Sequence, residues 1–420
     1  MIDRRSLVRA LGREELADWV VIERDQELAA IADQVHRTEQ RTRWQLTLHV
    51  DTPAGRGTAH VALDANEGDP DKVIEQAAVL ARLSVGPAWA TIPPAAPARV
   101  ELTDPVLATG DPLAAAAAIL RQLPRRPGAG IDARVTLLRE RVTVQARQSF
   151  HTEWSATLAR VDALVTQGAH AIAVAREARR ADQLDLTAAV DDAIADLSEL
   201  ARATEHVPGP CAVILTADAL LYGGLGVWEA FVTQADPVIA REGLTRYHEG
   251  APIAEASNTL AEPLSITSDG ALAFGVRSSP LGDAGDAVRR FPLIARGVAA
   301  GLALTPREAG LRGRDPNGGV RNLIVDAGTW DARAALTTPD RLRVIEVRRL
   351  RGLRIDPYTG DAELELALAI DRASGAPFVD GALRLDLIDV LARARRSKQT
   401  IRRGPYVGPA AVLIERADLI

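Results

Sequence analysis

The sequence predicts an α+β protein, with helices and antiparallel sheet mixed in its N-terminal units and a mostly antiparallel β domain at its C-terminal end. Two observations support this class. Alternating apolar and polar runs return on themselves as hairpins, and helices occur among strands without the regular strand–helix–strand alternation of parallel sheets. A chain of 420 residues is long enough for about two or three packed units.

The first unit, residues 1–87, begins with a short helix and continues mainly as strands. Residues 44–50 alternate, a turn containing proline and glycine follows, and residues 58–63 alternate again, which predicts a β-hairpin. Asp69 and Pro70 then predict a helix start. The carboxylate can accept hydrogen bonds from free backbone N–H groups, and proline is tolerated in the first turn.

A proline-rich linker at residues 86–98 leads to a second unit, residues 99–208. Asp111, which is also followed by proline, predicts another helix start. The later elements are predicted as two alternating strands and one long amphipathic helix, at residues 134–138, 141–146 and 186–204.

The main boundary is expected at residues 207–210, where Val-Pro-Gly-Pro interrupts the chain before an apolar strand at 211–215. Residues 209–420 are predicted as one β-rich domain. Its helices are expected near residues 217–234, 297–304 and 383–396.

Charge and cysteine content narrow the class of protein. The net charge of −6 and the pI near 5.8 give no general attraction to nucleic acid or to an anionic membrane. Cys211 is the only cysteine, so an intramolecular disulfide is impossible. The first residues lack the apolar stretch of a secretory signal, and no window reaches the roughly 18 apolar residues of a membrane span. We therefore expect a cytoplasmic protein without a membrane partner.

Common metal-binding and nucleophile patterns do not occur. No two of the seven histidines lie within four residues of each other, so no helix presents a pair of imidazoles. His49 and His60 can face each other across the predicted hairpin without an identifiable third ligand, and scattered carboxylates remain an alternative source of ligands. Cys211, in an apolar strand, is expected to be an inert thiol. The glycine-rich segment 222–226 follows a predicted helix instead of a strand and is a weak phosphate-loop candidate.

Two polar segments in the last domain have ordinary interpretations. His248 and Glu249 could serve acid–base chemistry, but Pro252 disfavours the helix that would add a ligand one turn later, so a loop is expected. Six Lys and Arg residues between 393 and 403 have only Tyr406 as an aromatic neighbour. A solvated helix end or a contact for an acidic partner explains them better than a nucleic-acid site.

A series of short segments occurs in order through the C-terminal half. They are Ser-Ser-Pro-Leu-Gly-Asp-Ala-Gly at 278–285, Arg-Arg-Phe-Pro-Leu-Ile-Ala-Arg-Gly-Val at 289–298, Gly-Leu-Arg-Gly at 310–313, Asn-Gly-Gly-Val-Arg-Asn-Leu at 317–323, Asp-Pro-Tyr-Thr-Gly-Asp at 356–361 and Ala-Pro-Phe-Val-Asp-Gly-Ala-Leu-Arg-Leu at 376–385. This order resembles the TldD/PmbA family, whose PmbA branch is also called TldE. Residues 283–286, Asp-Ala-Gly-Asp, depart from the family's Asp-x-Glu-Gly, so the chain resembles a divergent member.

The resemblance implies a subunit that binds no metal and has no catalytic residue of its own. TldD subunits carry a His-Glu-x-x-x-His helix and a C-terminal cysteine that form a zinc site, whereas PmbA/TldE subunits lack these ligands and pair with TldD. The helix position here holds Trp228, Glu229 and Thr233, and no cysteine occurs near residues 404–407. Trp and Thr supply neither imidazole nor thiolate, and without a metal Glu229 has no polarised water to deprotonate.

The resemblance further implies a heterodimeric metallopeptidase complex in which a TldD-like partner binds zinc and this chain helps form a cleft for extended peptides. The candidate substrate-binding residues are Ser278, Ser279, Tyr358 and Thr359. Three alternatives remain: a stand-alone peptide-binding protein of the same fold, a hydrolase that uses Glu229 or His248, and a nucleic-acid regulator that uses residues 393–403.

Overall fold

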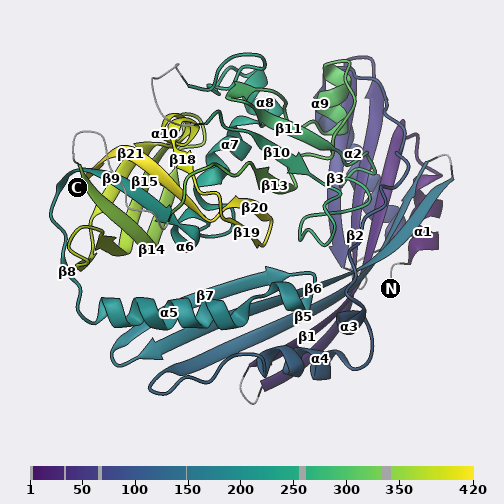
Figure 1. The fold of residues 1–420 in the computed structure, drawn as a ribbon. Coiled ribbons are helices and arrows are strands. Elements are labelled where there is room, and N and C mark those ends of the chain that lie inside the picture. Colours follow the sequence, from purple (N-terminus) through teal and green to yellow (C-terminus); the bar gives the residue numbers. More distant parts are fainter. Residues whose placement is uncertain (1–2, 33–34, 65–68, 148, 255–261, 333–341) are drawn as a thin grey trace.

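The structure is a computed structural model that describes residues 3–32, 35–64, 69–147, 149–254, 262–332 and 342–420 (Figure 1). Its helices are α1 (Arg4–Leu11), α2 (Pro70–Leu83), α3 (Pro105–Ala108), α4 (Pro112–Leu120), α5 (Leu186–Leu200), α6 (Ala217–Leu220), α7 (Glu229–Gln234), α8 (Pro237–Arg241), α9 (Pro306–Leu311) and α10 (Leu387–Arg393). Two 3-10 turns, η1 (Ala181–Gln183) and η2 (Gly226–Trp228), precede α5 and α7.

The N-terminal half forms one antiparallel seven-stranded sheet in the order β4-β3-β2-β1-β5-β6-β7. Its strands are β1 (Asp18–Ala32), β2 (Val35–Thr52), β3 (Gly55–Asp64), β4 (Val85–Gly86), β5 (Gly130–Ala146), β6 (Phe150–Gln167) and β7 (His170–Ala178). Strand β1 pairs with β5 from Val20–Ala146 to Ala32–Arg134, so the sheet joins the segments 1–87 and 99–208.

The long central strands bury apolar residues at both ends and carry polar residues in the middle. Helices α1 and α2 cover one end, where Trp44, Leu46 and Ile74 belong to one apolar core. Helices α4 and α5 cover the other end through two further cores. Gly57 permits the close approach of α2 to β3, because a Cβ there would lie 1.8 Å from the Ala81 carbonyl oxygen.

The C-terminal half contains two sheets. The first has the order β12-β11-β10-β13-β20-β19 and consists of β10 (Ile266–Asp269), β11 (Arg290–Ala295), β12 (Val298–Ala299), β13 (Asn322–Val325), β19 (Thr400–Arg403) and β20 (Tyr406–Pro409). The second has the order β14-β9-β21-β17-β15-β16-β8 and consists of β8 (Thr204–Glu205), β9 (Gly209–Thr216), β14 (Arg343–Ile355), β15 (Asp361–Asp371), β16 (Pro377–Val379), β17 (Ala382–Asp386) and β21 (Ala411–Leu419), with β18 (Arg395–Arg396) paired to β21.

An additional pairing of β14 with β15 closes five strands of the second sheet into a ring. One large apolar core contains residues of this ring, of the first sheet and of α7, including Val213, Leu323 and Phe231. Figure 1 shows the long N-terminal sheet curving past these C-terminal sheets, with β7, α5 and the turn between β19 and β20 at the junction.

Most sequence-based expectations for the elements are confirmed. The fold is α+β with a strand-rich C-terminal half. The hairpin is present as β2 and β3, with Thr52 opposite Gly55, and the side chains of Asp69 and Asp111 accept hydrogen bonds from the first turns of α2 and α4. None of the helices in the described part of the chain has the length and apolar content needed to span a bilayer.

Four expectations are wrong, wholly or in part. The two strands predicted at 134–138 and 141–146 are parts of the single strand β5, because the polar residues between them belong to the middle of the sheet. The helix predicted at 297–304 is replaced by a turn at Gly297 and the short strand β12; the helix begins later, after the cap residue Thr305. The helix expected near 383–396 begins only at Leu387, because residues 382–386 form strand β17. The segment predicted as a linker is an irregular connection that is packed: Trp89 is buried, and the Ala95 N–H donates to the Gly285 carbonyl across the junction.

Candidate functional site

The degenerate metal-site helix is short and lies inside the C-terminal core. Gly226 begins the 3-10 turn before α7 with φ 56°, and a Cβ there would lie 2.0 Å from the Leu220 carbonyl oxygen. This turn directs Trp228 inwards, where its side chain is 0% exposed. Glu229, the next residue, is exposed, and its side chain makes no hydrogen bond or ion pair with the described residues.

Three aromatic side chains pack together at this position. The ring of Trp228 lies 6.1 Å from that of Phe231 and 6.1 Å from that of Tyr406, with the latter pair stacked at 20°. All three side chains are fully buried. The Tyr406 hydroxyl donates to the Pro409 carbonyl oxygen at 3.1 Å, and burial raises the pKa of Tyr406 well above its usual value. We call Trp228, Phe231 and Tyr406 the aromatic stack.

The residues at these positions do not fit a zinc ion. The structure does bring the α7 position and the 404–407 segment together, since Trp228 contacts Tyr406, but an indole and a neutral phenol fill the space. The Thr233 hydroxyl donates to the Glu229 carbonyl oxygen at 3.0 Å within the helix. Across the described ranges, no group of three or more His, Cys, Asp or Glu side chains is arranged to hold a metal.

A cavity of about 1010 Å³ lies beside the aromatic stack, between the N-terminal sheet and the C-terminal half. Strand β7 contributes every residue from 171 to 177, although these residues alternate between the two faces of the sheet. The cavity therefore follows the edge of β7, which pairs only with β6 among the described strands. The opposite wall includes residues 221–224 after α6 and Arg403, Gly404 and Pro405 before β20. We call this cavity the β7 groove.

The β7 groove thus borders the 404–407 segment, which the resemblance matches to the region of the zinc-site cysteine. Gly404 and Pro405 line it, and the following residue, Tyr406, lies beneath them in the stack. Small side chains, Ala171, Ala173 and Ala175, are exposed along the strand. They leave the backbone edge of β7 accessible to another extended chain.

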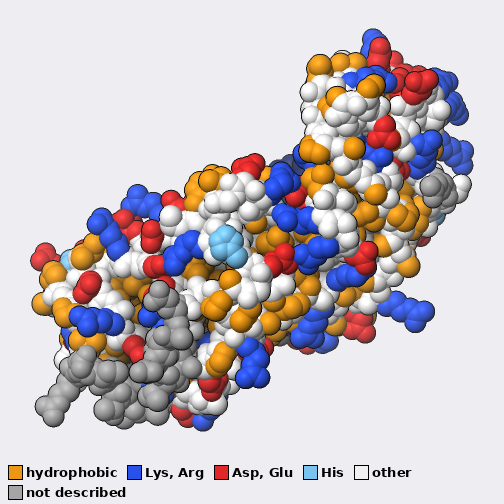
Figure 2. Space-filling view, turned by 90° about the horizontal axis from the view of Figure 1, so that it is seen from above, with side chains coloured by type: hydrophobic (Ala, Val, Ile, Leu, Met, Phe, Trp, Pro, Cys, Tyr) orange, Lys and Arg blue, Asp and Glu red, His pale blue; other side chains and the backbone are white. Residues whose placement is uncertain are grey.

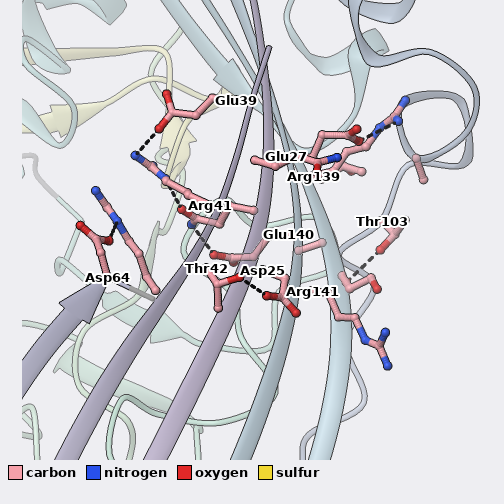
Figure 3. Close-up of a pocket in the computed structure, with 17 residues that line it drawn as sticks. Asp25, Glu27, Glu39, Arg41, Thr42, Asp64, Thr103, Arg139, Glu140 and Arg141 are labelled. Carbon is pink, nitrogen blue, oxygen red and sulfur yellow. Dashed lines mark hydrogen bonds and ion pairs between the residues drawn. The ribbon is translucent and has the colours of Figure 1, made fainter. Parts of the chain in front are cut away.

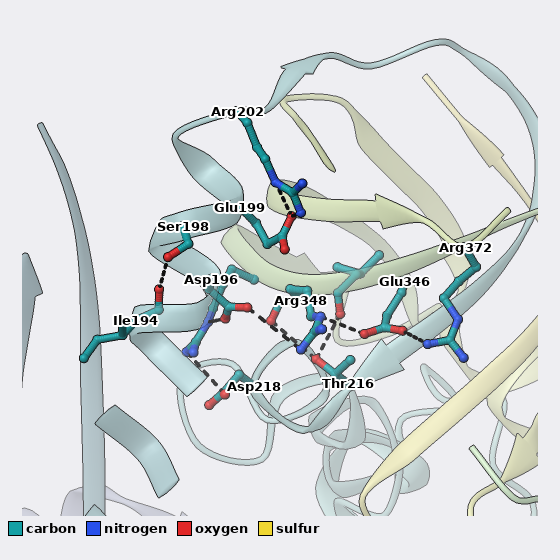
Figure 4. Close-up of polar contacts among 12 residues, drawn as sticks. Ile194, Asp196, Ser198, Glu199, Arg202, Thr216, Asp218, Glu346, Arg348 and Arg372 are labelled. Atoms are coloured by element: carbon teal, nitrogen blue, oxygen red, sulfur yellow. Dashed lines mark hydrogen bonds and ion pairs between the residues drawn. The ribbon is translucent and has the colours of Figure 1, made fainter. Parts of the chain in front are cut away.

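A network of buried ion pairs holds the two walls of the groove together. Asp196 of α5 lies 2.7 Å from Arg349 and 3.9 Å from Arg348, both on β14. Figure 4 shows the network continuing from Arg348 to Glu346 and then to Arg372. Burial raises the pKa of Asp196, partly offset by the adjacent Arg349.

The proposed substrate-binding residues occupy two separate loops. Ser278 is buried: its hydroxyl donates to the Leu272 carbonyl oxygen at 2.7 Å and accepts from Asn322 Nδ2 at 2.8 Å. Ser279 is half-buried beside it. Tyr358 and Thr359 are exposed in the turn between β14 and β15. The two pairs share no hydrogen bond or cavity within the described ranges, and neither pair lines the β7 groove.

The turn that carries Tyr358 is attached to the far end of α7. Gln234 Nε2 donates to the carbonyl oxygens of Pro357 and Tyr358 at 3.0 and 2.8 Å. The loop that carries Ser278 is attached to the N-terminal half, because the guanidinium of Arg179 donates to the carbonyl oxygens of Gly275, Val276 and Ser278. Only the Ser278 loop therefore lies at the junction, whereas the Tyr358 turn packs within the C-terminal half.

Other residues considered from the sequence have internal roles. Cys211 is buried, and burial raises the pKa of its thiol to about 11, which keeps it protonated. His49 and His60 each bond a threonine of the facing strand, Thr58 and Thr47, at 2.9 Å. Burial lowers the pKa of His49 to about 4.

The basic cluster between 393 and 403 does not form one surface patch. Most of its members contact other parts of the chain: Arg393 pairs with Asp389, Arg396 is buried against backbone carbonyls, Lys398 pairs with Asp331, Arg402 bonds the Ala273 carbonyl and Arg403 pairs with Asp218. On the face shown in Figure 2, basic and acidic side chains are interspersed. This arrangement lacks the continuous basic surface of a nucleic-acid site.

A second cavity, of about 1050 Å³, lies at the polar middle of the N-terminal sheet (Figure 3). Most of its charged side chains are paired, either with each other or with residues beside the cavity. Arg139 lies 3.1 Å from Glu27. The side-chain amide of Gln26 donates from Nε2 to Glu140 at 2.7 Å and accepts at Oε1 from Arg41 Nε at 2.8 Å. This balanced network explains how polar residues are accommodated between the two apolar cores of the sheet.

Comparison with known proteins agrees with this architecture. Residues 253–419 match the family model described as the PmbA/TldA metallopeptidase C-terminal domain. No curated protein matches the chain in sequence.

Three solved structures resemble the whole chain. A Bacteroides thetaiotaomicron protein described as a candidate modulator of DNA gyrase has a TM-score of 0.77 at 14% identity, covering 99% of this chain and 97% of that one. TldE from Thermococcus kodakarensis has a TM-score of 0.76 at 15% identity, covering 99% of both chains. A Thermotoga maritima protein, also described as a candidate modulator of a DNA gyrase, has a TM-score of 0.76 at 15% identity, covering 99% and 98%. The chain therefore carries a C-terminal domain of the PmbA/TldD family within a fold like that of TldE.

Proposed function

We propose that this chain is the TldE-like, non-metal-binding subunit of a metallopeptidase complex, paired with a TldD-like subunit that binds the zinc. The aromatic stack carries this proposal. The resemblance matches Trp228 to one of the three metal ligands of a TldD-like subunit and residues 404–407 to the region of another. Trp228 and Tyr406, which lies in that segment, form a buried apolar contact. A site filled in this way cannot hold a metal with an open position for water, which zinc hydrolysis requires.

The role of the chain in the complex is to help hold an extended peptide. The edge of β7 supports this role, because an added strand can pair with its free backbone N–H and C=O groups. The small exposed side chains of Ala171, Ala173 and Ala175 allow a strand of many sequences to approach. We therefore propose peptide processing with recognition mainly through the peptide backbone.

Co-expression with a paralogue that contains His-Glu-x-x-x-His tests the subunit proposal. We expect stable co-purification, zinc at about one ion per pair, and peptidase activity in the pair but not in this chain alone. A chain that stays monomeric or homodimeric beside every such paralogue would favour the stand-alone peptide-binding protein. Tight zinc binding by this chain alone would contradict the assignment of Trp228 and Tyr406.

Substitution of the β7 edge tests the peptide groove separately. Ala173→Lys places a charged side chain along the edge strand and should weaken binding of a short labelled peptide by about tenfold, which corresponds to about 1.4 kcal/mol. Ala188→Lys, on the exposed face of α5, is the matched control and should leave the affinity unchanged. Equal affinities of the two variants would place the peptide elsewhere.

A further inference from the structure

Three arginines from three different strands surround one carboxylate at the wall of the β7 groove. Asp218 of α6 lies 2.6 Å from Arg403 of β19 and 3.3 Å from Arg349 of β14. Arg176 of β7 lies further away, at 3.7 Å. All four residues line the groove. Burial opposes ionisation of Asp218, but the three guanidinium groups outweigh it and lower its pKa.

The cluster contains one more positive charge than negative charge. Arg349 also pairs with Asp196 at 2.7 Å, so three guanidinium groups share two carboxylates. Arg348, the other partner of Asp196, is also paired with Glu346 at 2.7 Å, a carboxylate that it shares with Arg372. None of these three residues lines the groove. The lining of the whole groove has the same balance, with five arginines and four acidic residues.

Arg176 is the least satisfied member of the cluster. Its side chain is only 9% exposed, on the strand face that also buries Ile172 and Val174. Among the described residues its one hydrogen bond is from Nη1 to the Ala175 carbonyl oxygen at 2.9 Å, although a guanidinium has five N–H donors. Burial, together with the nearby charge of Arg403, lowers its pKa to about 10. A buried cation with few acceptors is costly, and an anion in the groove would supply them.

We propose that Arg176 and Arg403 form a carboxylate-binding subsite at one end of the β7 groove. This inference rests on the proposed peptide groove. It adds that the groove prefers peptides that present a carboxylate to these two guanidinium groups. The single excess charge matches a monoanionic carboxylate better than a dianionic phosphate, because Asp218 already neutralises part of the cluster.

Two sources of the carboxylate are distinguishable by the direction of the peptide. Arg176 is near the C-terminal end of β7. A terminal carboxylate held there would end the peptide at the subsite and make it run parallel to β7. An Asp or Glu side chain would let the peptide continue past the subsite in either direction.

Fluorescence anisotropy with the full-length chain tests the subsite with three short labelled peptides of Ala and Val. The first has a free C-terminus and no acidic residue, the second is amidated and contains one Glu, and the third is amidated and contains Gln in place of the Glu. We expect at least one of the first two to bind about tenfold more tightly than the third, as a charge-assisted hydrogen bond would give. The peptide that binds more tightly than the third identifies the source of the carboxylate.

Arg176→Gln should remove this preference, so that the three peptides bind with equal affinity. Arg176→Lys should keep part of the preference, and Arg403→Gln, at a more exposed position, should reduce it without disturbing the β7 strand. Arg126→Gln is the control, because it removes an exposed guanidinium that is paired with Asp191 outside the groove. This variant should keep the full preference for the carboxylate-bearing peptide.

Equal binding of all three peptides to the unsubstituted chain would overturn the subsite while leaving the groove intact. A preference that survives both Arg176→Gln and Arg403→Gln would also overturn it. Failure of every peptide to bind would overturn the groove together with the subsite, whereas the subunit proposal would still be decided by co-purification.

Discussion

Trp228 shows how a single side chain changes the character of a site. The resemblance matches this residue to an imidazole ligand of the TldD helix. In the structure its indole packs against Phe231 and Tyr406 in a large apolar core. The indole N–H is buried without a hydrogen-bond acceptor among the described residues, which is a small cost within a large apolar contact.

Trp228→Ala should therefore destabilise the protein strongly. Loss of a fully buried tryptophan typically costs about 3–5 kcal/mol in the free energy of unfolding, because a cavity is left behind. Urea unfolding followed by far-UV circular dichroism measures the change. Trp154→Ala, at a half-buried position on β6, is the matched control and should cost less. A similar loss in both variants would mean that the stack contributes little.

Asp286 is a buried carboxyl in the segment where the sequence departs from the family motif. Burial raises the pKa of its side chain from 3.8 to about 6, against weaker opposing contributions from backbone N–H groups and Arg321. Because the folded-state pKa is above the unfolded value, ionisation favours unfolding. The group carries no penalty below about pH 4, and the protein loses stability as the pH rises from about 4 to about 6.

Asp286→Asn should remove this pH dependence. The variant should be more stable than the unsubstituted chain by up to about 3 kcal/mol above pH 6, with the gain disappearing towards pH 4. Urea unfolding across this pH range gives the difference directly. The same substitution at the nearby exposed Asp283 controls for the loss of a carboxylate. A gain of equal size at every pH would contradict burial as its cause.

Among the elements, α5 links the two halves of the molecule. One face of the helix covers β6 and β7, and the helix also contacts β15 of the C-terminal ring and the adjacent strand β16. Asp196 on α5 is buried and paired with two arginines of β14. The helix therefore fixes the position of the β7 edge relative to the opposite wall of the groove.

Asp196→Ala should cost about 3 kcal/mol in the free energy of unfolding, because the buried charge of Arg349 would retain only Asp218 as a partner. Urea unfolding measures the loss. Asp191→Ala, on the same helix, removes the carboxylate of an exposed pair with Arg126 and should change the stability little. Equal effects of the two substitutions would show that the α5–β14 contact contributes no more than a surface pair.

At the scale of the whole molecule, the seven-stranded sheet makes the first two segments one cooperative structure. Strand β1 has partners on both sides, β2 from its own segment and β5 from the next. A chain that ends before β5 would leave the full length of β1 unpaired on one side, and it would lack the residues that satisfy the polar middle of the sheet, such as Glu140.

A fragment of residues 1–208 should therefore unfold cooperatively, whereas a fragment of residues 1–98 should aggregate or remain unfolded. Thermal unfolding followed by circular dichroism, with size-exclusion chromatography of the same samples, distinguishes the two. A cooperative transition in the shorter fragment would show that β1, β2 and β3 are stable without β5.

Local signals made much of the fold predictable. Alternation over residues 44–63 and the Asp-Pro pairs before α2 and α4 encode their elements through short-range hydrogen bonds, and the structure has them where expected. The wrong predictions fall on segments whose secondary structure depends on tertiary packing. The polar middle of β5 interrupts the expected pattern because it lies between two cores, and the 297–304 segment follows the turn geometry of Gly297 instead of its apolar composition.

The candidate site was only partly readable from the sequence. The ordered motifs identified the α7 position and the missing cysteine, but not the contact between Trp228 and Tyr406, which are far apart in the chain. Arg176 offered a readable signal that was missed: it follows Ile172 and Val174 on the buried face of β7, where a charged residue needs a partner. That partner, Asp218, comes from a distant segment.

The sequence by itself determined the class of fold, the positions of most caps and hairpins, and the absence of His and Cys at residues 228, 233 and 404–407, because these depend on neighbouring residues or on residue type. Only the tertiary structure decided that the two altered positions form one aromatic stack, that β7 is an edge strand facing a groove, and that three arginines converge on Asp218. Such arrangements depend on packing between segments that are distant in the chain, and no local pattern specifies them.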